Sequence, residues 1–514
     1  MLLAGLWGVP AGAAPRVATD AGLLQGAAAD GIESFKGIPF AVPPVGALRW
    51  RPPQPAPHWA GVRDAVGFGS DCMQLRQRPG NGQTTPSEDC LFVNVWRPAA
   101  RSGARLPVLV WIYGGAFIAG GSSEPRQDGT PFAVQGLVFV SFNYRLGRFG
   151  FFGFPALTRE HPDETHGNYG YMDQIAALAW VKRNIAAFGG DPHHVTVMGE
   201  SAGGESLVAL LAAPQARDLF HQVILQSSGA RTALTGIRNL STDRPGLPSA
   251  ESLGRNFAAS LGIEGEGPEA LARLRALPAE QIAAGVSGSA LRDGSLDATY
   301  GGPLLDGRIV TEEPRAAYLA GRTPAVAVLC GATNADLGQV DAASKDALFE
   351  RFGERRAAAI AAYDPQGDAP LSILQAEVGA DQLMVEPARA LAAAAAGRGL
   401  AAYEYRFSYV SPAKREIWKR GAPHGSDVPF AFDSVAQGGG ADAADTALAH
   451  LVNRFFAQFA RTGDPNGEGL PHWPRYTKAG LLINFTASGE AVAGPDPWAA
   501  RLDVVSGADL GARP

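Results

Sequence analysis

Five apolar runs rich in β-branched residues recur along the chain. Each run is apolar at nearly every position, which predicts a strand buried on both faces, as in a parallel sheet. The runs are 106–113 (LPVLVWIY), 136–144 (GLVFVSFNY), 194–199 (HVTVMG), 221–228 (HQVILQSS) and 324–331 (PAVAVLCG). Between the second and third runs, residues 171–190 carry apolar side chains at helical spacing and end in a glycine pair. Strands that alternate with helices predict an α/β domain with a mostly parallel sheet.

The length and composition fit one large domain. The chain has 514 residues, of which 46% are hydrophobic and 18% charged, as in a folded globular protein with ample core. Two segments depart from the strand and helix rhythm: residues 231–300 are polar and Pro-rich, and residues 341–400 are Ala-rich and helical. We interpret both as excursions from the sheet that form pocket walls. Residues 14–514 are therefore predicted to be a single domain.

The stretch 197–206, VMGESAGGES, places one serine in a frame of glycines. Residues 199–203 match G-x-S-x-G, directly after the strand HVTVM and before the helix-forming ESLVALLAA. Such a turn is so sharp that its neighbours must be small, and it lifts the serine oxygen above the sheet at a helix N-terminus. A Gly-rich turn without chemistry is the alternative, but the strand before and the helix after favour Ser201 as a nucleophile.

A serine nucleophile needs a base, and in this fold the order along the chain is serine, acid, histidine. His221, His424, His450 and His472 follow residue 201. His424 lies in GAPHGSDVPFAF, a loop framed by glycine and proline that can present an imidazole to a cleft. The other three histidines are expected to be structural or to face solvent.

The acid is expected at the end of a strand between the nucleophile and the base. The run PAVAVLCG continues into ATNADLG, which puts Asp336 in the following loop. There it would accept a hydrogen bond from the imidazole and stabilise the imidazolium. An ordinary surface-loop aspartate is the alternative reading of the spacing alone.

An oxyanion hole requires main-chain N–H groups aimed at the developing negative charge. Ala202, the residue after the nucleophile, is expected to supply one donor. The loop 113–117 (YGGAF) follows an early strand and is expected to supply the others, since its small residues let the backbone approach the substrate.

The motifs resemble one family closely, the type-B carboxylesterase and cholinesterase-like branch of the α/β-hydrolases. The resemblance spans almost the whole chain after the N-terminal segment. The matching stretches include 35–53 (FKGIPFAVPPVGALRWRPP), 87–98 (SEDCLFVNVWRP), 111–117 (WIYGGAF), 143–153 (NYRLGRFGFFG) and the long run 167–204. Near the C-terminus, HGSDVPFAF and FFAQFARTGDPNG continue the match.

The resemblance implies an α/β-hydrolase fold and a role for each matching position. Ser201 corresponds to the nucleophile and His424 to the base. Asp336 occupies the position of the acid, where most members carry Glu. Gly115, Ala116 and Ala202 correspond to the oxyanion donors. Glu200 resembles an acid that orders the site beside the nucleophile, and Asp427 stands at the usual Glu position after the histidine loop.

The reaction that follows from these roles is hydrolysis of a small-molecule carboxylic ester through an acyl-enzyme. No metal or organic cofactor is expected, because the sequence contains no ligand cluster for one. Two other functions are considered: a non-catalytic adhesion or binding protein on the same fold, and an acyltransferase or specialised esterase with the same triad. The sequence leaves the natural ester and the oligomeric state open.

Several partners are excluded by the sequence. The net charge of −6 and the absence of a long basic run argue against nucleic acid. Beyond the N-terminus, no stretch has the roughly 20 uninterrupted apolar residues of a membrane-spanning helix. Residues 73–89 contain no aromatic side chain, so the choline-binding tryptophan of cholinesterases has no counterpart there.

The N-terminus and the cysteines point to export. Residues 2–9 are apolar and are followed by Ala-Gly-Ala, a small-residue cleavage pattern, so residues 1–13 are expected to be a secretory signal of a secreted or periplasmic protein. Cys72 and Cys90 flank a polar, loop-like stretch, and the resemblance implies that they form the family's first disulfide. Two unpaired thiols are the alternative from spacing alone. Cys330 lies in an apolar run and is expected to be buried and unreactive.

Overall fold

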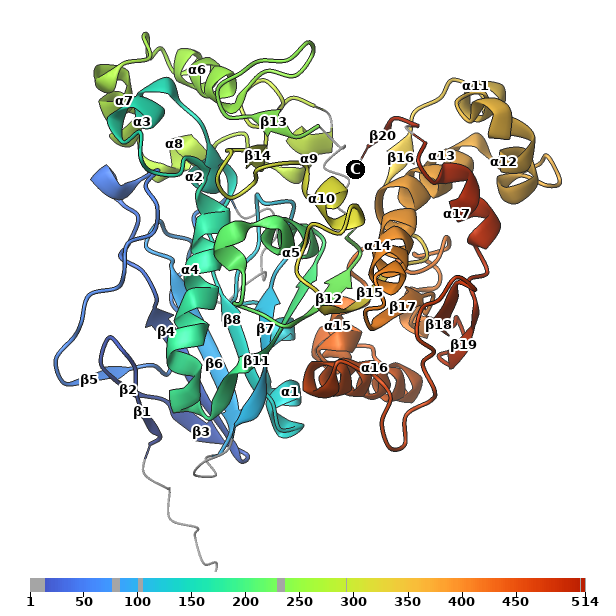
Figure 1. Ribbon diagram of the computed structural model, residues 1–514, viewed down its shortest axis with the longest axis horizontal. Coiled ribbons are helices and arrows are strands. Elements are labelled where there is room, and N and C mark those ends of the chain that lie inside the picture. Colours follow the sequence, from blue (N-terminus) through green and yellow to red (C-terminus); the bar gives the residue numbers. More distant parts are fainter. Residues whose placement is uncertain are drawn as a thin grey trace, which may run out of the picture.

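A large mixed sheet forms the centre of the computed structural model, which describes residues 14–75, 84–99, 105–228, 236–292, 294–508 and 510–513 (Figure 1). Within these residues eleven strands pair in the order β19-β18-β17-β15-β12-β11-β7-β8-β6-β4-β3. Their bounds are β3 Ala27–Ala29, β4 Ile32–Pro39, β6 Phe92–Pro98, β7 Leu106–Ile112, β8 Val138–Phe142, β11 Gly190–Glu200, β12 Gln222–Gln226, β15 Ala327–Thr333, β17 Ala402–Phe407, β18 Leu481–Phe485 and β19 Ala491–Pro495.

The five predicted strands are confirmed, and they are neighbours. They correspond to β15, β12, β11, β7 and β8, which pair parallel to one another in that order. Their side chains are almost entirely buried, since helices cover both faces of the sheet. At one edge of the sheet, β6 pairs antiparallel with β8, β4 with β6 and β3 with β4. At the other edge, β19 pairs antiparallel with β18. The fold class is therefore α/β, as predicted.

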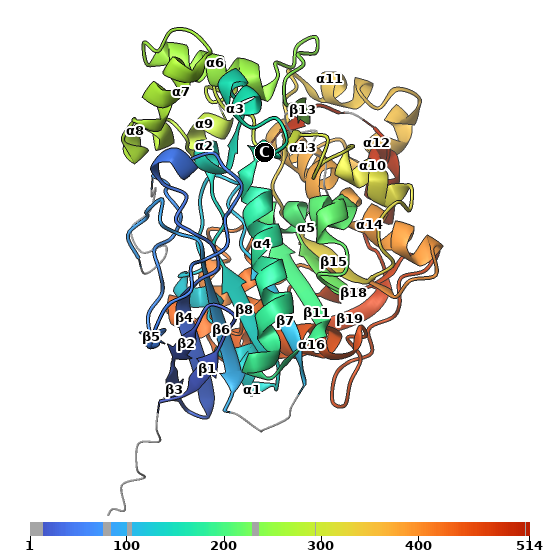
Figure 2. The ribbon, with the colours of Figure 1, turned by 60° about the vertical axis from the view of Figure 1, so that its left-hand side comes forward.

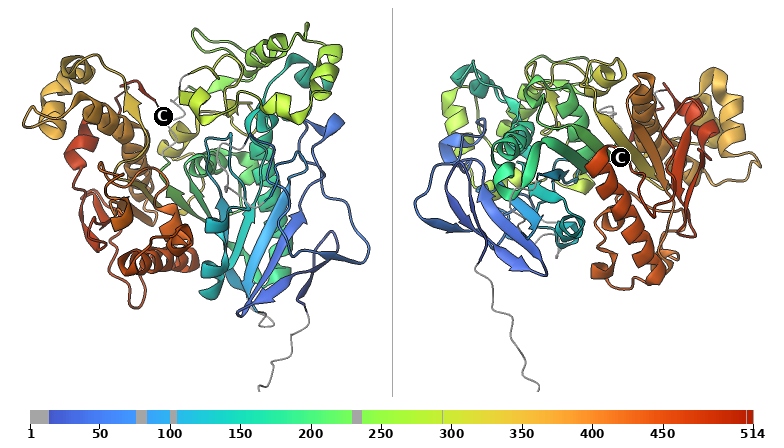
Figure 3. Two further views of the ribbon diagram at one scale, coloured as in Figure 1. Left: turned by 180° about the vertical axis from the view of Figure 1, so that it is seen from behind. Right: turned by 60° about the horizontal axis from the view of Figure 1, so that its bottom comes forward.

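Helices cover both faces of the sheet. On the face toward the viewer in Figure 1 lie α4 (Tyr169–Asn184), α5 (Ala202–Ala212) and α14 (Glu386–Gly397), and Figure 2 shows α4 running across the central strands. The opposite face carries α1 (Thr130–Val134) and α16 (Ala443–Thr462), which is seen from behind in Figure 3. Helix α16 begins with a capping box between Asp442 and Asp445 and buries its apolar side.

Two groups of helices stand on either side of the upper part of the molecule in Figure 1. The first comprises α6 (Ala250–Ser260), α7 (Pro268–Arg275), α8 (Ala279–Ala283) and α9 (Gly288–Arg292), and the second α11 (Lys345–Glu350), α12 (Arg356–Tyr363) and α13 (Leu371–Ala380). The excursion from the sheet that was predicted over 341–400 ends earlier than expected, before residue 386. Residues 386–397 form α14, which packs on β15 and β17 and buries Leu391, Ala392 and Ala395 completely. Its alanines allow the helix to lie close to the sheet.

The remaining elements are short. The strands are β1 (Arg16–Ala18), β2 (Leu23–Gln25), β5 (Val62–Asp64), β9 (Phe151–Phe152), β10 (Gly167–Asn168), β13 (Arg238–Asn239), β14 (Leu304–Leu305), β16 (Gln339–Val340) and β20 (Ala512–Arg513). The helices are α2 (Gly147–Gly150), α3 (Pro155–Glu160), α10 (Pro314–Leu319), α15 (Val428–Ala431) and α17 (Ala499–Val505). The segment Asp381–Val385 between α13 and α14 is a π-helix.

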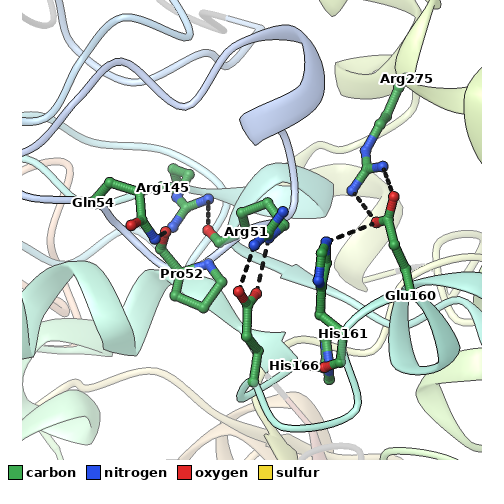
Figure 4. Close-up of polar contacts among 9 residues, drawn as sticks. Arg51, Pro52, Gln54, Arg145, Glu160, His161, His166 and Arg275 are labelled. Atoms are coloured by element: carbon green, nitrogen blue, oxygen red, sulfur yellow. Dashed lines mark hydrogen bonds and ion pairs between the residues drawn. The ribbon is translucent and has the colours of Figure 1, made fainter.

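Arginine contacts join α7 to α3, and the loop after β8 to the chain at Arg51 (Figure 4). The guanidinium of Arg275, at the end of α7, pairs with both carboxylate oxygens of Glu160 at the end of α3. Arg145 donates to the carbonyl of Arg51 at 2.9 Å. The same guanidinium forms a buried bidentate pair with Asp173 on α4, at 2.8 Å for both bonds. These contacts fix the loop after β8 against α4, next to the strands that carry the site.

Candidate active site

Ser201 stands on a sharp turn between the central strand β11 and helix α5. Its backbone has φ +53°, an uncommon conformation for a residue with a side chain. The Ser201 N–H donates to the carbonyl of Gln226 on the neighbouring strand β12 at 3.0 Å. The turn thus holds the serine hydroxyl at the carboxyl end of the sheet.

The glycines around Ser201 are required by close backbone contacts. A Cβ at Gly199 would lie 2.5 Å from the carbonyl carbon of Gly203, and a Cβ at Gly203 would lie 2.0 Å from the carbonyl oxygen of Ile112 on β7. Both distances are far below van der Waals contact. The G-x-S-x-G pattern therefore reflects the packing of the elbow against its neighbouring strand.

The structure brings Ser201, His424 and Asp336 together in one chain of hydrogen bonds. The Nε2 atom of His424 lies 2.8 Å from Ser201 Oγ, and its Nδ1 atom lies 2.6 Å from Asp336 Oδ1. These three residues are separated by 88 and 223 positions in the sequence, yet both distances are those of good hydrogen bonds. The loop after β17 delivers His424, and the loop after β15 delivers Asp336.

Asp336 is buried and completely surrounded by hydrogen-bond donors. Besides His424, its carboxylate accepts from the hydroxyl of Ser227 at 2.7 Å, the N–H of Thr333 at 3.1 Å and the N–H of Leu337 at 2.7 Å. Burial alone would raise the pKa of Asp336, but the imidazole and these donors outweigh it and hold the pKa below its usual value. The carboxylate is therefore ionised where it meets the histidine, although it is one methylene shorter than the glutamate common in the family.

The loop after β7 lies beside the serine and presents free N–H groups. A Cβ at Gly114 would lie 2.4 Å from the Glu200 carboxylate and 3.0 Å from Ser201 Cβ, so this loop touches the nucleophile's turn. Gly115 and Ala116 have φ of +108° and +55° and are exposed. Within the described residues, the N–H groups of Gly115, Ala116 and Ala202 have no hydrogen-bond acceptor, which leaves them available to an oxyanion.

Glu200 faces His424 from the side opposite Asp336. Its Oε1 atom lies 3.2 Å from His424 Nε2, and the residue is only 8% exposed. Burial raises the pKa of Glu200 to about 7, in spite of the opposing effect of the imidazole. Burial would lower the pKa of His424, but the two carboxylates, Asp336 and then Glu200, raise it to about 9. The histidine is thus held between two acids.

Asp427 is buried behind the histidine and does not bond to it. Its Oδ2 atom accepts from the side chain of Gln226 at 3.0 Å and from the hydroxyl of Tyr405 at 2.7 Å. Burial raises the pKa of Asp427. Gln226 therefore serves two partners, because its carbonyl holds Ser201 and its side chain holds Asp427. The sequence analysis missed Gln226, as nothing in the strand HQVILQSS marks its sixth residue.

Ser227 is a second residue that the sequence analysis missed. It has φ +43°, is fully buried, and donates its hydroxyl to Asp336. Of the eight described non-glycine residues with positive φ, Ala116, Phe117, Ser201 and Ser227 all belong to the turns that build this site. Such a cluster of strained backbone is typical of functional sites.

The other histidines have different surroundings. His221 precedes β12 and accepts from the Val195 N–H at 3.2 Å, and exposed His450 on α16 pairs with Asp433. His472 is exposed. These placements agree with the structural or solvent-facing roles expected for them.

Cys72 and Cys90 form a disulfide with an S–S distance of 2.03 Å, and Cys330 is a free, buried thiol. Residues 1–13, the predicted signal, lie outside the described residues. In the described ranges, no three His, Cys, Asp or Glu side chains are grouped so that they could hold a metal ion. Among the described helices, none combines the length and apolarity needed to span a bilayer.

Comparison with known proteins identifies the family. The chain matches the carboxylesterase family over residues 13–351 and 375–493. It is 36% identical to fumonisin B1 esterase of Sphingopyxis macrogoltabida over 496 residues, which cover 92% of this chain and 87% of that protein. It is 35% identical to para-nitrobenzyl esterase of Bacillus subtilis (strain 168) over 493 residues, 91% of this chain and 94% of that protein.

A mammalian relative is similar over nearly the same length. Carboxylesterase 1C of Rattus norvegicus is 32% identical over 490 residues, 87% of this chain and 84% of that protein. The chain belongs to the carboxylesterase family, has the α/β-hydrolase fold of that family and is a carboxylic ester hydrolase.

Proposed function

We propose that this enzyme cleaves small-molecule carboxylic esters with Ser201 as nucleophile, His424 as general base and Asp336 as the acid of a catalytic triad. The observation that carries the proposal is the continuous chain of hydrogen bonds, 2.8 Å from Ser201 Oγ to His424 Nε2 and 2.6 Å from His424 Nδ1 to Asp336 Oδ1. Asp336 fixes the imidazole with Nδ1 protonated, which leaves Nε2 to accept the serine proton.

The reaction proceeds in two steps. In the first, His424 removes the proton of Ser201 as the serine oxygen attacks the ester carbonyl, and it returns that proton to the departing alcohol. In the second, His424 takes a proton from a water molecule as the water oxygen attacks the acyl carbonyl. The bond from the acyl group to Ser201 Oγ then breaks, His424 returns the proton to Ser201 Oγ, and the acid is released. The N–H groups of Gly115, Ala116 and Ala202 stabilise the oxyanion in both steps. Glu200 and Asp427 form no bond to the substrate: Glu200 raises the pKa of His424, and Asp427 binds the side chains of Gln226 and Tyr405 nearby.

The experiment is active-site labelling with a fluorophosphonate, followed by peptide mapping. We expect one label per chain, on Ser201, and none in Ser201→Ala. The matched control is Ser249→Ala, which removes the buried serine that caps α6 far along the chain from the nucleophile. This variant should label like the wild type once its folding is verified. A label on another residue, or full ester turnover in Ser201→Ala, would contradict the assignment.

Asp336 is tested by Asp336→Asn. The amide changes the tautomer that the histidine adopts, and kcat should fall about 10⁴-fold, as in other triads. The exposed acid Asp341 and the surface acid Glu312, which pairs with Arg322, provide the comparison. Amides at these two positions should leave kcat unchanged, and a wild-type rate in Asp336→Asn would place the acid elsewhere.

The names of the relatives guide the choice of substrate. Since they include a para-nitrobenzyl esterase and a fumonisin B1 esterase, we propose that esters with bulky alcohol groups are accepted. Para-nitrobenzyl acetate is a suitable first substrate. Addition of a competing alcohol tests acyl transfer, because a transferase would speed up and form a new ester.

Export and domain organisation complete the proposal. A disulfide suits an oxidising compartment, which supports a secreted or periplasmic enzyme whose residues 1–13 act as the signal. Residues 14–514 would then form one catalytic domain. N-terminal sequencing of the mature protein, isolated from the medium or periplasm, tests the export and the signal, and an intact Met1 would refute the signal.

A further inference from the structure

A short basic turn lies close to the candidate site and has no role in the chemistry above. We define it as residues 414–420, KREIWKR, which carry four cations and one acid in a chain whose net charge is −6. Lys414, Arg415, Lys419 and Arg420 are all exposed. Within the described residues, no carboxylate lies within 4.0 Å of any of these four groups. The basic turn is therefore a local positive patch on an acidic protein.

The tip of the basic turn is apolar. Ile417 is 72% exposed, the largest exposed fraction among the large hydrophobic side chains of the described residues, and Trp418 beside it is half-buried. The N–H groups of Ile417 and Trp418 both donate to the Lys414 carbonyl, at 2.9 and 2.8 Å, which forms the tight turn that holds Ile417 outward. An aliphatic and an aromatic side chain thus lie between two pairs of cations.

The basic turn lies at the end of the sheet that carries the site. Arg415 donates weakly to the carbonyl of Ala487, just beyond the end of β18, at 3.5 Å. Where the turn returns to the sheet, the Ala422 N–H donates to Asn334 Oδ1 at 2.7 Å, two residues before Asp336. The turn therefore leads directly into the loop that carries His424.

We propose that the basic turn docks this enzyme on an anionic lipid surface, with Ile417 and Trp418 entering the headgroup region and the four cations binding lipid charges. Basic side chains next to exposed apolar and aromatic ones are typical of interfacial binding. The negative charges elsewhere on the protein act weakly at the contact, since salt screens charges beyond about 8–10 Å. An anionic small substrate would use the cations but gives no reason for an exposed isoleucine between them.

The size of the effect follows from the charge count. Each basic group near an anionic membrane contributes about fivefold in affinity. Glu416 offsets one of the four cations, and Glu377 on α13 lies close enough to Arg420 to feel its charge. With both acids counted, two net positive charges predict about a 25-fold preference for anionic over zwitterionic vesicles.

The test is cosedimentation of the full-length protein with vesicles of equal parts phosphatidylglycerol and phosphatidylcholine, against phosphatidylcholine alone, at 0.1 M NaCl. Lys419→Glu with Arg420→Glu should abolish the preference, and 0.5 M NaCl should weaken binding of the wild type. Ile417→Ser should weaken binding to anionic vesicles about tenfold without changing its salt dependence. The turnover of a water-soluble ester should be the same in all variants, which verifies their fold.

Matched controls are available elsewhere on the surface. Val134 is 68% exposed, so Val134→Ser tests whether any exposed aliphatic side chain matters. Arg217→Glu with Lys478→Glu imposes the same change in net charge at two other exposed positions. Both controls should bind like the wild type.

Three results would overturn the proposal. The first is equal binding of the wild type to both kinds of vesicle. The second is unchanged binding after charge reversal in the basic turn. The third is absence of vesicle binding by the wild type, together with a loss of kcat/KM in Lys419→Glu with Arg420→Glu that is confined to an ester bearing a free carboxylate. That result would assign the turn to substrate selection instead.

Discussion

Replacement of Glu200 by glutamine should move the pH dependence of catalysis in a defined direction. As the proposed base, His424 must be neutral to accept the serine proton, so kcat/KM should rise with pH as the imidazole loses its proton. Two carboxylates oppose that loss and raise the pKa of His424 to about 9. Glu200→Gln removes one of the two charges and keeps the shape of the side chain. The rise in kcat/KM should therefore occur at a lower pH.

The 3.2 Å between Glu200 Oε1 and His424 Nε2 sets the minimum size of the shift. Even with the full dielectric screening of water, unit charges at this distance attract by about 1.3 kcal/mol, which corresponds to about one pKa unit. The pair is buried, so the screening is weaker and the shift larger. Glu200, with a pKa raised to about 7 by burial, is ionised over the range in which His424 titrates. The midpoint should fall by one pH unit or more.

The assay is kcat/KM for a neutral ester from pH 5 to 10, with each profile scaled to its own plateau. Scaling separates the titration from any loss of maximal rate. The control is Glu312→Gln, which removes a surface acid paired with Arg322 and should leave the midpoint unchanged. An unchanged or higher midpoint in Glu200→Gln would refute the electrostatic reasoning. Because the two groups titrate as a coupled pair, the measured midpoint belongs to both.

Three further changes have definite expected outcomes. Ser227→Ala removes a hydroxyl that donates to buried Asp336 and should lower kcat about tenfold with little change in KM; Ser228→Ala, whose hydroxyl has no partner among the described residues, should not. Alanine at both Cys72 and Cys90 opens a loop of 18 residues and should lower the free energy of unfolding by about 3 kcal/mol in denaturant titrations, whereas an unchanged midpoint would show that the bond is dispensable. Burial raises the pKa of Glu404 to about 8. Between about pH 4.5 and pH 8 the folded state therefore keeps a proton on Glu404 that the unfolded state releases. Over this range the free energy of unfolding of the wild type should fall, relative to that of Glu404→Gln, by about 1.4 kcal/mol per pH unit as the pH rises. Parallel stability curves for these two proteins would contradict that sign.

The central strands and the nucleophile's turn were predictable for physical reasons. Strands buried on both faces must be apolar throughout, and a turn that packs against the backbone of Ile112 tolerates only glycine. Strand β17 escaped the sequence analysis because its sequence AYEYRF carries Glu404 and Arg406, which would ordinarily face water. Both side chains are in fact buried, 3.8 Å apart, and Arg406 also pairs with Asp496 at 3.1 Å.

The supporting residues of the site could not be found from the sequence. Ser227 and Gln226 act through partners that are 109 and 201 positions away, and neither lies in a recognisable local pattern. Asp336 was predicted as the acid from its place after a strand, but the four donors that hold its carboxylate ionised are visible only in the folded structure. A local pattern predicts a turn, whereas the contacts that stabilise a charge depend on the folded chain.

The left-handed backbone at Ala116, Phe117, Ser201 and Ser227 has a consequence for how this enzyme can evolve or be engineered. Each such residue lowers the free energy of unfolding by on the order of 1–3 kcal/mol. Together the four lower it by an amount comparable with the 5–15 kcal/mol that is typical for a whole protein. Heat-resistant variants selected for retained activity should therefore carry their changes in the outlying helices α6–α9 and α11–α13. Variants selected for heat resistance alone should instead accumulate glycine at the four strained positions, and they should lose the reaction as they gain stability.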